Sequence, residues 1–322
     1  MRKIKVGTRA SALALSQTTA LAEELARAGN FDFEIVHVKS DGDKSKEPLM
    51  QLGGTGVFVS RLRQALLDDK VDIIVHSLKD LPTYPEEGIS LATIAKRENP
   101  ADVLCAKGDY TLTTLPKGAK VGTGSPRRAA QLLSYRDDLQ IVDIRGNIDT
   151  RIKRIEQDLD AVILAYAGLE RLGKTAVISE VLNPSEFIAA PGQGALAVEC
   201  KTEVLTSDDE VAQAIKTGLT ALNDTETRAA TTAERDVLAI AEQGCSAPIG
   251  VYAHFPAANL LEINAIMYPS TTDMSTEDLQ IAKDQNFAQE KLSVEVPKDC
   301  DVVSFAKQQG QQVAYKLLEK LK

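Results

Sequence analysis

The stretch Lys120–Leu172, KVGTGSPRRAAQLLSYRDDLQIVDIRGNIDTRIKRIEQDLDAVILAYAGLERL, decides the fold class. Strand-like runs at 120–122, 139–144 and 161–165 each lead into a segment with the spacing of an amphipathic helix. Strands that alternate with helices in this way run in parallel, because each helix carries the chain back to the starting edge of the sheet. The stretch therefore predicts parallel strands covered by helices.

The same alternation extends toward the N-terminus. Further strands are predicted at 3–7, 33–38, 71–75 and 103–106, and further helices at 11–28 and 57–69. Residues 40–56 interrupt the alternation with a polar, Gly-rich segment, and a loop of this length inside a compact domain is usually functional. Residues 98–100 and 187–194 are predicted to cross between two lobes.

The last third of the chain has a different pattern. Two helical segments, 208–222 and 225–242, are followed by strand-like segments at 248–255, 260–267 and 291–296 and by a closing helix at 302–320. Strands that follow one another directly predict an antiparallel arrangement. The fold class expected for the whole chain is thus α/β, with two lobes of mainly parallel sheets and a smaller C-terminal α+β domain.

Composition and charge exclude several classes of protein. The 322 residues are 43% hydrophobic and 26% charged, which is ordinary for a soluble protein of two or three domains. No apolar run approaches the roughly 20 residues of a membrane span. The N-terminus shows no signal-peptide pattern, so we expect a cytoplasmic protein. A net charge of −9 argues against a nucleic-acid partner, and the scattered four Cys and three His argue against a metal site.

Three predicted strand ends carry a small residue, a helix-capping residue and arginine. They are GTRAS at 7–11, GTGSPRR at 122–128 and RGNIDTR at 145–151. Ligands of open α/β sheets bind at the carboxyl ends of strands, where all three turns would lie. In the second turn Ser125 suits the N-cap position and Pro126 suits the first helical position.

Arg127 and Arg128 would then lie in the first turn of a helix, beside the positive end of its dipole. Two cations there cost stability unless an anion lies between them. Residues 120–154 hold eight Lys and Arg against four Asp. A solvated basic face is the alternative for any one arginine. Three such turns together favour a polyanion site, because guanidinium groups bind carboxylates and phosphates in a bidentate manner.

Two further motifs carry reactive groups. HSLKDLP at 76–82 places Lys79 and Asp80 after a predicted buried strand. A surface ion pair of little energetic value is one reading. In the other reading, the carboxylate stays ionised in a basic cleft and stabilises a cation or transfers protons. GCSAP at 244–248 places Cys245 among small residues, where it is either a small buried apolar residue or an exposed reactive thiol.

Together these motifs resemble the porphobilinogen deaminase family, also called the hydroxymethylbilane synthases. The matching stretches, in chain order, are VGTRASALALSQ, HSLKDLPT, VGTGSPRRAAQL, IRGNIDTRI, AVILAYAGLERLG, APGQGALAVEC and GCSAPIGVYA. The resemblance implies two periplasmic-binding-protein-like lobes within a three-domain chain. The implied domains are 1–96 with 197–217, then 97–196, and then 218–322.

The resemblance also implies a reaction and a cofactor. Family members are cytoplasmic, monomeric transferases of tetrapyrrole and heme biosynthesis, with no metal, membrane or nucleic-acid partner. They join four porphobilinogen molecules head to tail with loss of ammonia, and water releases the linear tetrapyrrole. The primer is a dipyrromethane held as a thioether by the cysteine that matches Cys245. Primer and product together present about twelve carboxylates, which explains an Arg-rich site in an acidic protein.

The family's site residues transfer to this chain motif by motif. Asp80 matches the catalytic carboxylate, which stabilises the cation left after ammonia departs and passes protons. The residues that match primer-binding positions are Lys79, Ser125, Arg127, Arg128 and Arg171, with Thr123 as a further hydroxyl donor. The residues that match positions for the incoming ring or growing chain are Arg9, Ser11, Arg145 and Arg151.

The chain departs from the family in the segment 40–56. Gln51 and Thr55 stand where the family often has lysines, which puts substrate contacts of this segment in doubt. An alternative function from another class is a non-catalytic two-lobe binding protein for a small anion. Such a protein would use the same strand-end arginines, but it would not need Asp80 or a reactive Cys245.

Overall fold

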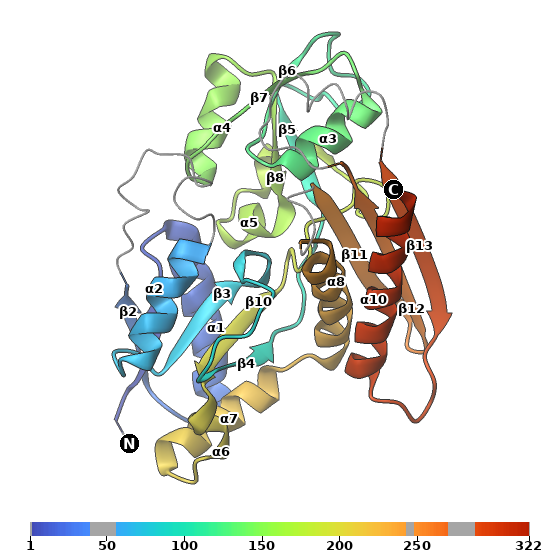
Figure 1. Ribbon diagram of the computed structural model, residues 1–322. Coiled ribbons are helices and arrows are strands. Elements are labelled where there is room, and N and C mark those ends of the chain that lie inside the picture. Colours follow the sequence, from blue (N-terminus) through green and yellow to red (C-terminus); the bar gives the residue numbers. More distant parts are fainter. Residues whose placement is uncertain (1, 39–55, 243–247, 270–286, 322) are drawn as a thin grey trace. The chain divides into compact units, whose positions relative to one another are not determined.

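The computed structural model describes residues 2–38, 56–242, 248–269 and 287–321 (Figure 1). The chain forms two compact units, and each contains two separate segments of the sequence. Unit 1 comprises Met1–Glu98 and Ala195–Arg228, and unit 2 comprises Asn99–Gly194 and Ala229–Lys322. The division into three domains stays a prediction. Among the described residues, no helix has the length and apolar character required to cross a membrane.

Unit 1 is built on a five-stranded sheet with the order β2-β1-β3-β10-β4. The strands are β1 (Ile4–Thr8), β2 (Phe33–His37), β3 (Ile73–Ser77), β4 (Ile89–Ile94) and β10 (Leu196–Lys201). The helices are α1 (Ala12–Gly29), α2 (Gly56–Leu67), α6 (Thr202–Thr206) and α7 (Glu210–Leu222), with a 3₁₀ turn η2 at Leu78–Asp80. Strand β1 is parallel to both β2 and β3.

The expectation of mainly parallel sheets is wrong, because two of the four strand pairings in each five-stranded sheet are antiparallel. Strand β10 is antiparallel to both of its neighbours, β3 and β4, so the sheet of unit 1 is mixed. The direction of β10 follows from where the chain enters the sheet, because Leu196, the first residue of β10, pairs with Ser77, the last residue of β3. The chain therefore re-enters unit 1 at the carboxyl edge of the parallel strands and must run the other way.

The core of unit 1 explains how α1 and α7 pack. Leu21 and Leu25 of α1 are buried against β1 residues such as Val6. Gly218 of α7 allows close packing, because a Cβ there would lie 2.7 Å from the carbonyl oxygen of Leu25. The predicted helix over 11–28 is confirmed and shifted by one residue, with Asn30 as a left-handed C-cap.

Unit 2 contains a second five-stranded sheet, with the order β7-β6-β8-β5-β9. The strands are β5 (Asp102–Ala106), β6 (Lys120–Gly122), β7 (Gln140–Val142), β8 (Ala161–Ala165) and β9 (Glu180–Val181). The helices are α3 (Pro126–Tyr135), α4 (Ile148–Gln157) and α5 (Tyr166–Arg171), with a 3₁₀ turn η3 at Thr175–Val177. Strand β6 is parallel to β7 and β8, whereas β5 is antiparallel to β8 and β9.

Both faces of this second sheet are covered by apolar clusters. Successive β8 residues alternate between them, since Ile163 belongs to one cluster and Val162 and Leu164 belong to the other. A continuous apolar run such as AVILA is typical of a strand buried on both faces. The α/β class predicted from Lys120–Leu172 is confirmed.

The C-terminal part of unit 2 is a three-stranded antiparallel sheet packed against two helices (Figure 1). Its elements are α8 (Thr225–Glu242), whose residues up to Arg228 belong to unit 1, β11 (Ile249–Ala257), β12 (Leu260–Met267), β13 (Ala288–Glu295) and α10 (Val302–Lys320). Apolar residues of one sheet face, such as Val251 and Ile263, meet Ala233 of α8 and Val313 of α10. The predicted smaller α+β arrangement is confirmed, although its third strand begins at Ala288 rather than at 291.

Candidate functional site

The first set of predicted site residues lies in unit 1, at the carboxyl ends of β1 and β3. These ends share one sheet edge because Gly7 pairs with Ile74. Arg9 directly follows β1 and is partly exposed. Ser11 is the N-cap of α1, and its hydroxyl accepts the N–H of Ala14 at 3.2 Å. The predicted cap is confirmed, and that bond occupies one of the hydroxyl's acceptor positions.

Lys79 and Asp80 lie on the 3₁₀ turn that follows β3. The turn is anchored by Leu78, which is fully buried and donates its N–H to the Ala195 carbonyl at 3.0 Å. Lys79 is exposed and Asp80 is partly exposed. Within the residues that the structure describes, the Asp80 carboxylate makes no ion pair, either with Lys79 or with another cation. Its capacity as an acceptor is therefore available to a ligand.

The second set lies in unit 2, where β6 leads into α3. Thr123 is fully buried, and its Oγ1 accepts the N–H of Ser125 at 3.2 Å. Gly124 fits here because a Cβ would lie 2.6 Å from the carbonyl oxygen of Ile144. Ser125 occupies the predicted N-cap position ahead of Pro126, but its side chain makes no capping bond. The first turn of α3 thus keeps backbone N–H groups that its cap does not satisfy.

Arg127 and Arg128 are buried on α3 and share a carboxylate that no sequence motif indicates. Asp102, the first residue of β5, is fully buried. Arg127 donates to its Oδ2 at 2.8 Å, and Arg128 donates to its Oδ1 through two nitrogens at 2.6 and 3.0 Å. The anion that two adjacent cations require is supplied by the chain itself. A lone Asp before an apolar run gives no sequence signal of partners 25 and 26 residues away.

Burial and charge oppose each other in this trio. Burial alone would raise the pKa of Asp102, but the charges of Arg127 and Arg128 outweigh burial and hold the pKa well below its usual range. Burial lowers the pKa of Arg127, and the charge of Arg128 adds to that effect. The trio carries a net charge of +1 because both guanidinium groups remain protonated.

Further arginines gather near Arg128. Arg151 on α4 donates through Nε to the Gly146 carbonyl at 2.8 Å, and Arg145 is exposed with its Nε 3.4 Å from Asp143. Burial lowers the pKa of Arg151, and the positive charges of Arg128 and Arg145 lower it further. Mutual repulsion among these cations means that an anionic ligand bound beside them would be stabilised.

Arg171 and Cys245 complete the predicted set. Arg171 is the last residue of α5, is partly exposed and donates to the Gly194 carbonyl at 3.0 Å. Cys245 lies outside the described residues, as do Gln51 and Thr55. The structure thus places Arg127, Arg128, Arg145 and Arg151 after the carboxyl ends of β6 and β7, at one sheet edge of unit 2. Arg9, Ser11, Lys79 and Asp80 lie at one sheet edge of unit 1.

The remaining cysteines differ in chemical character. Burial raises the pKa of Cys105 to about 12, and burial together with the adjacent Glu199 raises the pKa of Cys200 to about 12. Both thiols are therefore protonated at neutral pH and are poor nucleophiles. Cys300 is partly exposed. Among the described residues, no group of three His, Cys, Asp or Glu is arranged to hold a metal ion.

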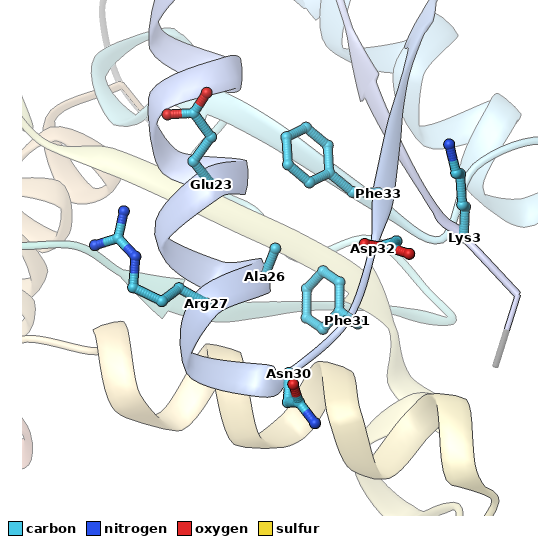
Figure 2. A pocket seen from close by; sticks show the side chains of 8 residues that line it. All are labelled: Lys3, Glu23, Ala26, Arg27, Asn30, Phe31, Asp32 and Phe33. Carbon is cyan, nitrogen blue, oxygen red and sulfur yellow. The ribbon is translucent and has the colours of Figure 1, made fainter.

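A surface pocket in unit 1 is separate from these residues. Figure 2 shows its lining from α1 and from the residues before β1 and β2, including Lys3, Arg27 and Phe31. Lys3 precedes β1, whereas Arg9 follows it, so the pocket lies at the opposite end of that strand from the predicted site. No residue predicted for the site lines it.

A family model and several known proteins match most of the chain in sequence. The family model described as "Porphobilinogen deaminase, dipyromethane cofactor binding domain" matches residues 4–211. Porphobilinogen deaminase of Thermobifida fusca is 44% identical over 98% of this chain and 93% of its own length. That of Leifsonia xyli is 50% identical over 82% of this chain and 79% of its own length. Among solved structures, the BvgS VFT2 domain of Bordetella pertussis is 14% identical, with a TM-score of 0.41 over 70% of this chain and 89% of that domain.

Proposed function

The chain belongs to the porphobilinogen deaminase family, transferases of tetrapyrrole biosynthesis that carry a dipyrromethane cofactor, and from this membership we propose its reaction. The protein joins four porphobilinogen molecules head to tail, with loss of one ammonia per ring. Water then releases the linear product, hydroxymethylbilane. We infer a cytoplasmic monomer.

The arginine-rich edge of unit 2 is the observation that supports this proposal most directly. Each pyrrole ring of the substrate carries an acetate and a propionate, so the bound chain is a polyanion. Burial is the main cause of the lowered pKa of Arg151, and the nearby charges of Arg128 and Arg145 add to it. The proximity of these three cations favours an anion at this edge. The donor set of this edge fits a ligand whose recognition groups are carboxylates.

The proposed binding residues form two sets, one for the dipyrromethane and one for the substrate. The residues proposed to hold the carboxylates of the dipyrromethane are Lys79, Thr123, Ser125, Arg127, Arg128 and Arg171. The residues proposed to bind the incoming ring or the growing chain are Arg9, Ser11, Arg145 and Arg151. When bound, the dipyrromethane supplies the terminal pyrrole carbon to which new rings are added.

Asp80 carries the proposed acid–base chemistry. Loss of ammonia leaves positive charge on the substrate ring, and an ionised carboxylate stabilises that charge. The same carboxylate can accept the proton that the attacked ring carbon loses. Because Asp80 has no ion-pair partner among the described residues, its charge is not already compensated by a neighbouring side chain.

Cys245 is proposed to hold the dipyrromethane through a thioether. Two of the other cysteines, Cys105 and Cys200, are buried thiols with a raised pKa and are unsuited to covalent attachment. Cys300 lies outside the stretches that match the family, whereas Cys245 lies in GCSAPIGVYA. The family motif therefore selects Cys245.

Intact-protein mass spectrometry tests the proposal. We expect freshly purified wild-type protein to carry the added mass of two linked pyrrole rings. The Cys245→Ser variant should lack this mass and be inactive, while the matched control Cys300→Ser should keep both mass and activity. An unmodified mass in active wild-type protein would contradict the proposed function.

A further inference from the structure

The buried carboxylate of Asp102 lies at the sheet edge where the arginines of unit 2 gather. In the antiparallel pairing of β5 with β8, Asp102 stands opposite Ala165, the last residue of β8. The parallel strand β6 leads from this same edge into Ser125 and α3. The Asp102 carboxylate is fully buried, so its negative charge has to be compensated by neighbouring groups. The identity of these groups indicates the role of Asp102.

Asp102 receives hydrogen bonds from three side chains. Besides the bonds from Arg127 and Arg128, its Oδ1 accepts the Nε2 of Gln193 at 2.9 Å. Arg127 also donates to the Ile188 carbonyl at 2.6 Å, and Arg128 donates to the Ile163 carbonyl at 3.1 Å. Each guanidinium group is therefore held from two directions.

These bonds leave donors for a ligand. A guanidinium group has five N–H donors. Arg127 uses two in the bonds given above, and Arg128 uses three. The remaining N–H groups have no acceptor among the residues that the structure describes, and their orientation is set by the bonds to Asp102. Asp102 also offsets one of the two positive charges.

Unit 1 contains a comparable carboxylate in a different position. Glu199 of β10 is 3% exposed and accepts hydrogen bonds from Arg63 of α2, the shortest at 2.7 Å. The Nε2 of His76 lies 3.2 Å from its Oε2. However, Glu199 pairs with Ile74 in the interior of β3, away from the carboxyl edge. A buried carboxylate with an arginine partner is therefore not by itself a sign of a binding role.

We propose that Asp102 is a positioning residue for the dipyrromethane, acting through Arg127 and Arg128. It holds both guanidinium groups in place before any ligand binds and thereby lowers the ordering cost of binding. This inference rests on the proposed function, since it assumes that the two arginines hold the carboxylates of the dipyrromethane. It adds a residue that touches neither substrate nor cofactor.

The test compares Asp102→Asn with Glu199→Gln. Each substitution removes a buried, paired negative charge and keeps the shape of the side chain. We expect both variants to melt at a lower temperature than wild type. Only Asp102→Asn should also reduce the fraction of protein that carries the two-ring mass. We expect a decrease of about tenfold, the size seen when residues that orient metal ligands are replaced.

The outcomes separate the inference from the proposed function. Unchanged occupancy in Asp102→Asn, with wild type fully occupied, would overturn the positioning role and leave the proposed function intact. Equal loss of occupancy in Glu199→Gln would overturn it as well, because a general loss of stability would then explain both. Absence of the two-ring mass from wild type would instead defeat the proposed function.

A second variant covers the case in which Asp102→Asn does not fold. Asp102→Glu keeps the charge and shifts the carboxylate by one methylene group. If positioning matters, occupancy should fall at least about threefold at a melting temperature no lower than that of Glu199→Gln. Full occupancy in a folded Asp102→Glu variant would overturn the inference.

Discussion

The sheets of the two units share one topology and differ in charge. The order β2-β1-β3-β10-β4 in unit 1 corresponds strand by strand to β7-β6-β8-β5-β9 in unit 2. Each has a parallel trio of strands at one side and two antiparallel pairings at the other. In both, a buried threonine marks the end of the central parallel strand, since Thr8 is the last residue of β1 and Thr123 directly follows β6.

The charged groups at the two carboxyl edges are different. Unit 1 presents Asp80 without an ion-pair partner in the described part of the chain, together with Lys79 and Arg9. Unit 2 presents Arg128, Arg151 and their neighbours, which repel one another. The backbone thus provides the same edge twice. The unit 1 edge combines a carboxylate with cations, whereas arginines dominate the unit 2 edge. Variants at the two edges test this contrast.

The largest expected effect follows from Asp80→Ala. Without its carboxylate, unit 1 can neither stabilise a cationic substrate nor accept its proton, so turnover should fall by about 10²–10⁴-fold. The two-ring mass should remain, because the carboxylate-binding edge is untouched. Steady-state kinetics and intact mass measure both, with the exposed Glu87→Ala in the same unit as control. Normal turnover in Asp80→Ala would show that proton handling lies elsewhere.

Removal of either buried arginine of unit 2 should act on the cofactor instead. Arg127→Ala and Arg128→Ala each break a buried ion pair, so the free energy of unfolding should fall by about 3–5 kcal/mol. We expect most of the protein to lack the two-ring mass. The control is Arg154→Ala, whose pair with Asp158 is exposed and is worth under about 1 kcal/mol. If both buried-arginine variants carried the two-ring mass in full, the two arginines would not be needed to hold the cofactor, and the proposed difference between the two edges would be wrong.

The smallest effect concerns acid stability and Glu199. Burial would raise the pKa of Glu199, but His76 and Arg63 outweigh burial and hold it below the ordinary value. The ionised carboxylate therefore stabilises the fold above the ordinary Glu pKa of about 4.3, and this stabilisation is lost as the pH falls through the lowered pKa. Denaturant unfolding between neutral and acidic pH should show a shallower loss in Glu199→Gln than in wild type. Identical profiles would mean that this pair contributes no pH dependence.

Local patterns in the sequence predict much of the site. The predicted helix starts near Ser11, at Pro126 and at Ile148 are confirmed, since helix starts depend on near neighbours in the chain. The turn that carries Lys79 and Asp80 follows its buried strand as expected. Gathering of arginines at one edge follows from strand–helix alternation alone.

Long-range features could not be predicted in the same way. The partnership of Asp102 with Arg127 and Arg128 joins segments that come together only when β5 pairs with β8. The direction of β10 depends on the sheet edge at which the chain re-enters unit 1, and no local sequence pattern predicts this edge. Strand β4 is absent from the predicted elements, although Ile89, Thr93 and Ile94 are β-branched residues typical of strands.

The position of β10 also orders the events of protein synthesis. In unit 1, β10 lies between β3 and β4, so this sheet is incomplete until residue 201 has left the ribosome. The five strands of the unit 2 sheet all lie between residues 102 and 181 and are available earlier. The sheet of unit 2 can therefore be completed during translation before the sheet of unit 1, although unit 1 contains the N-terminus.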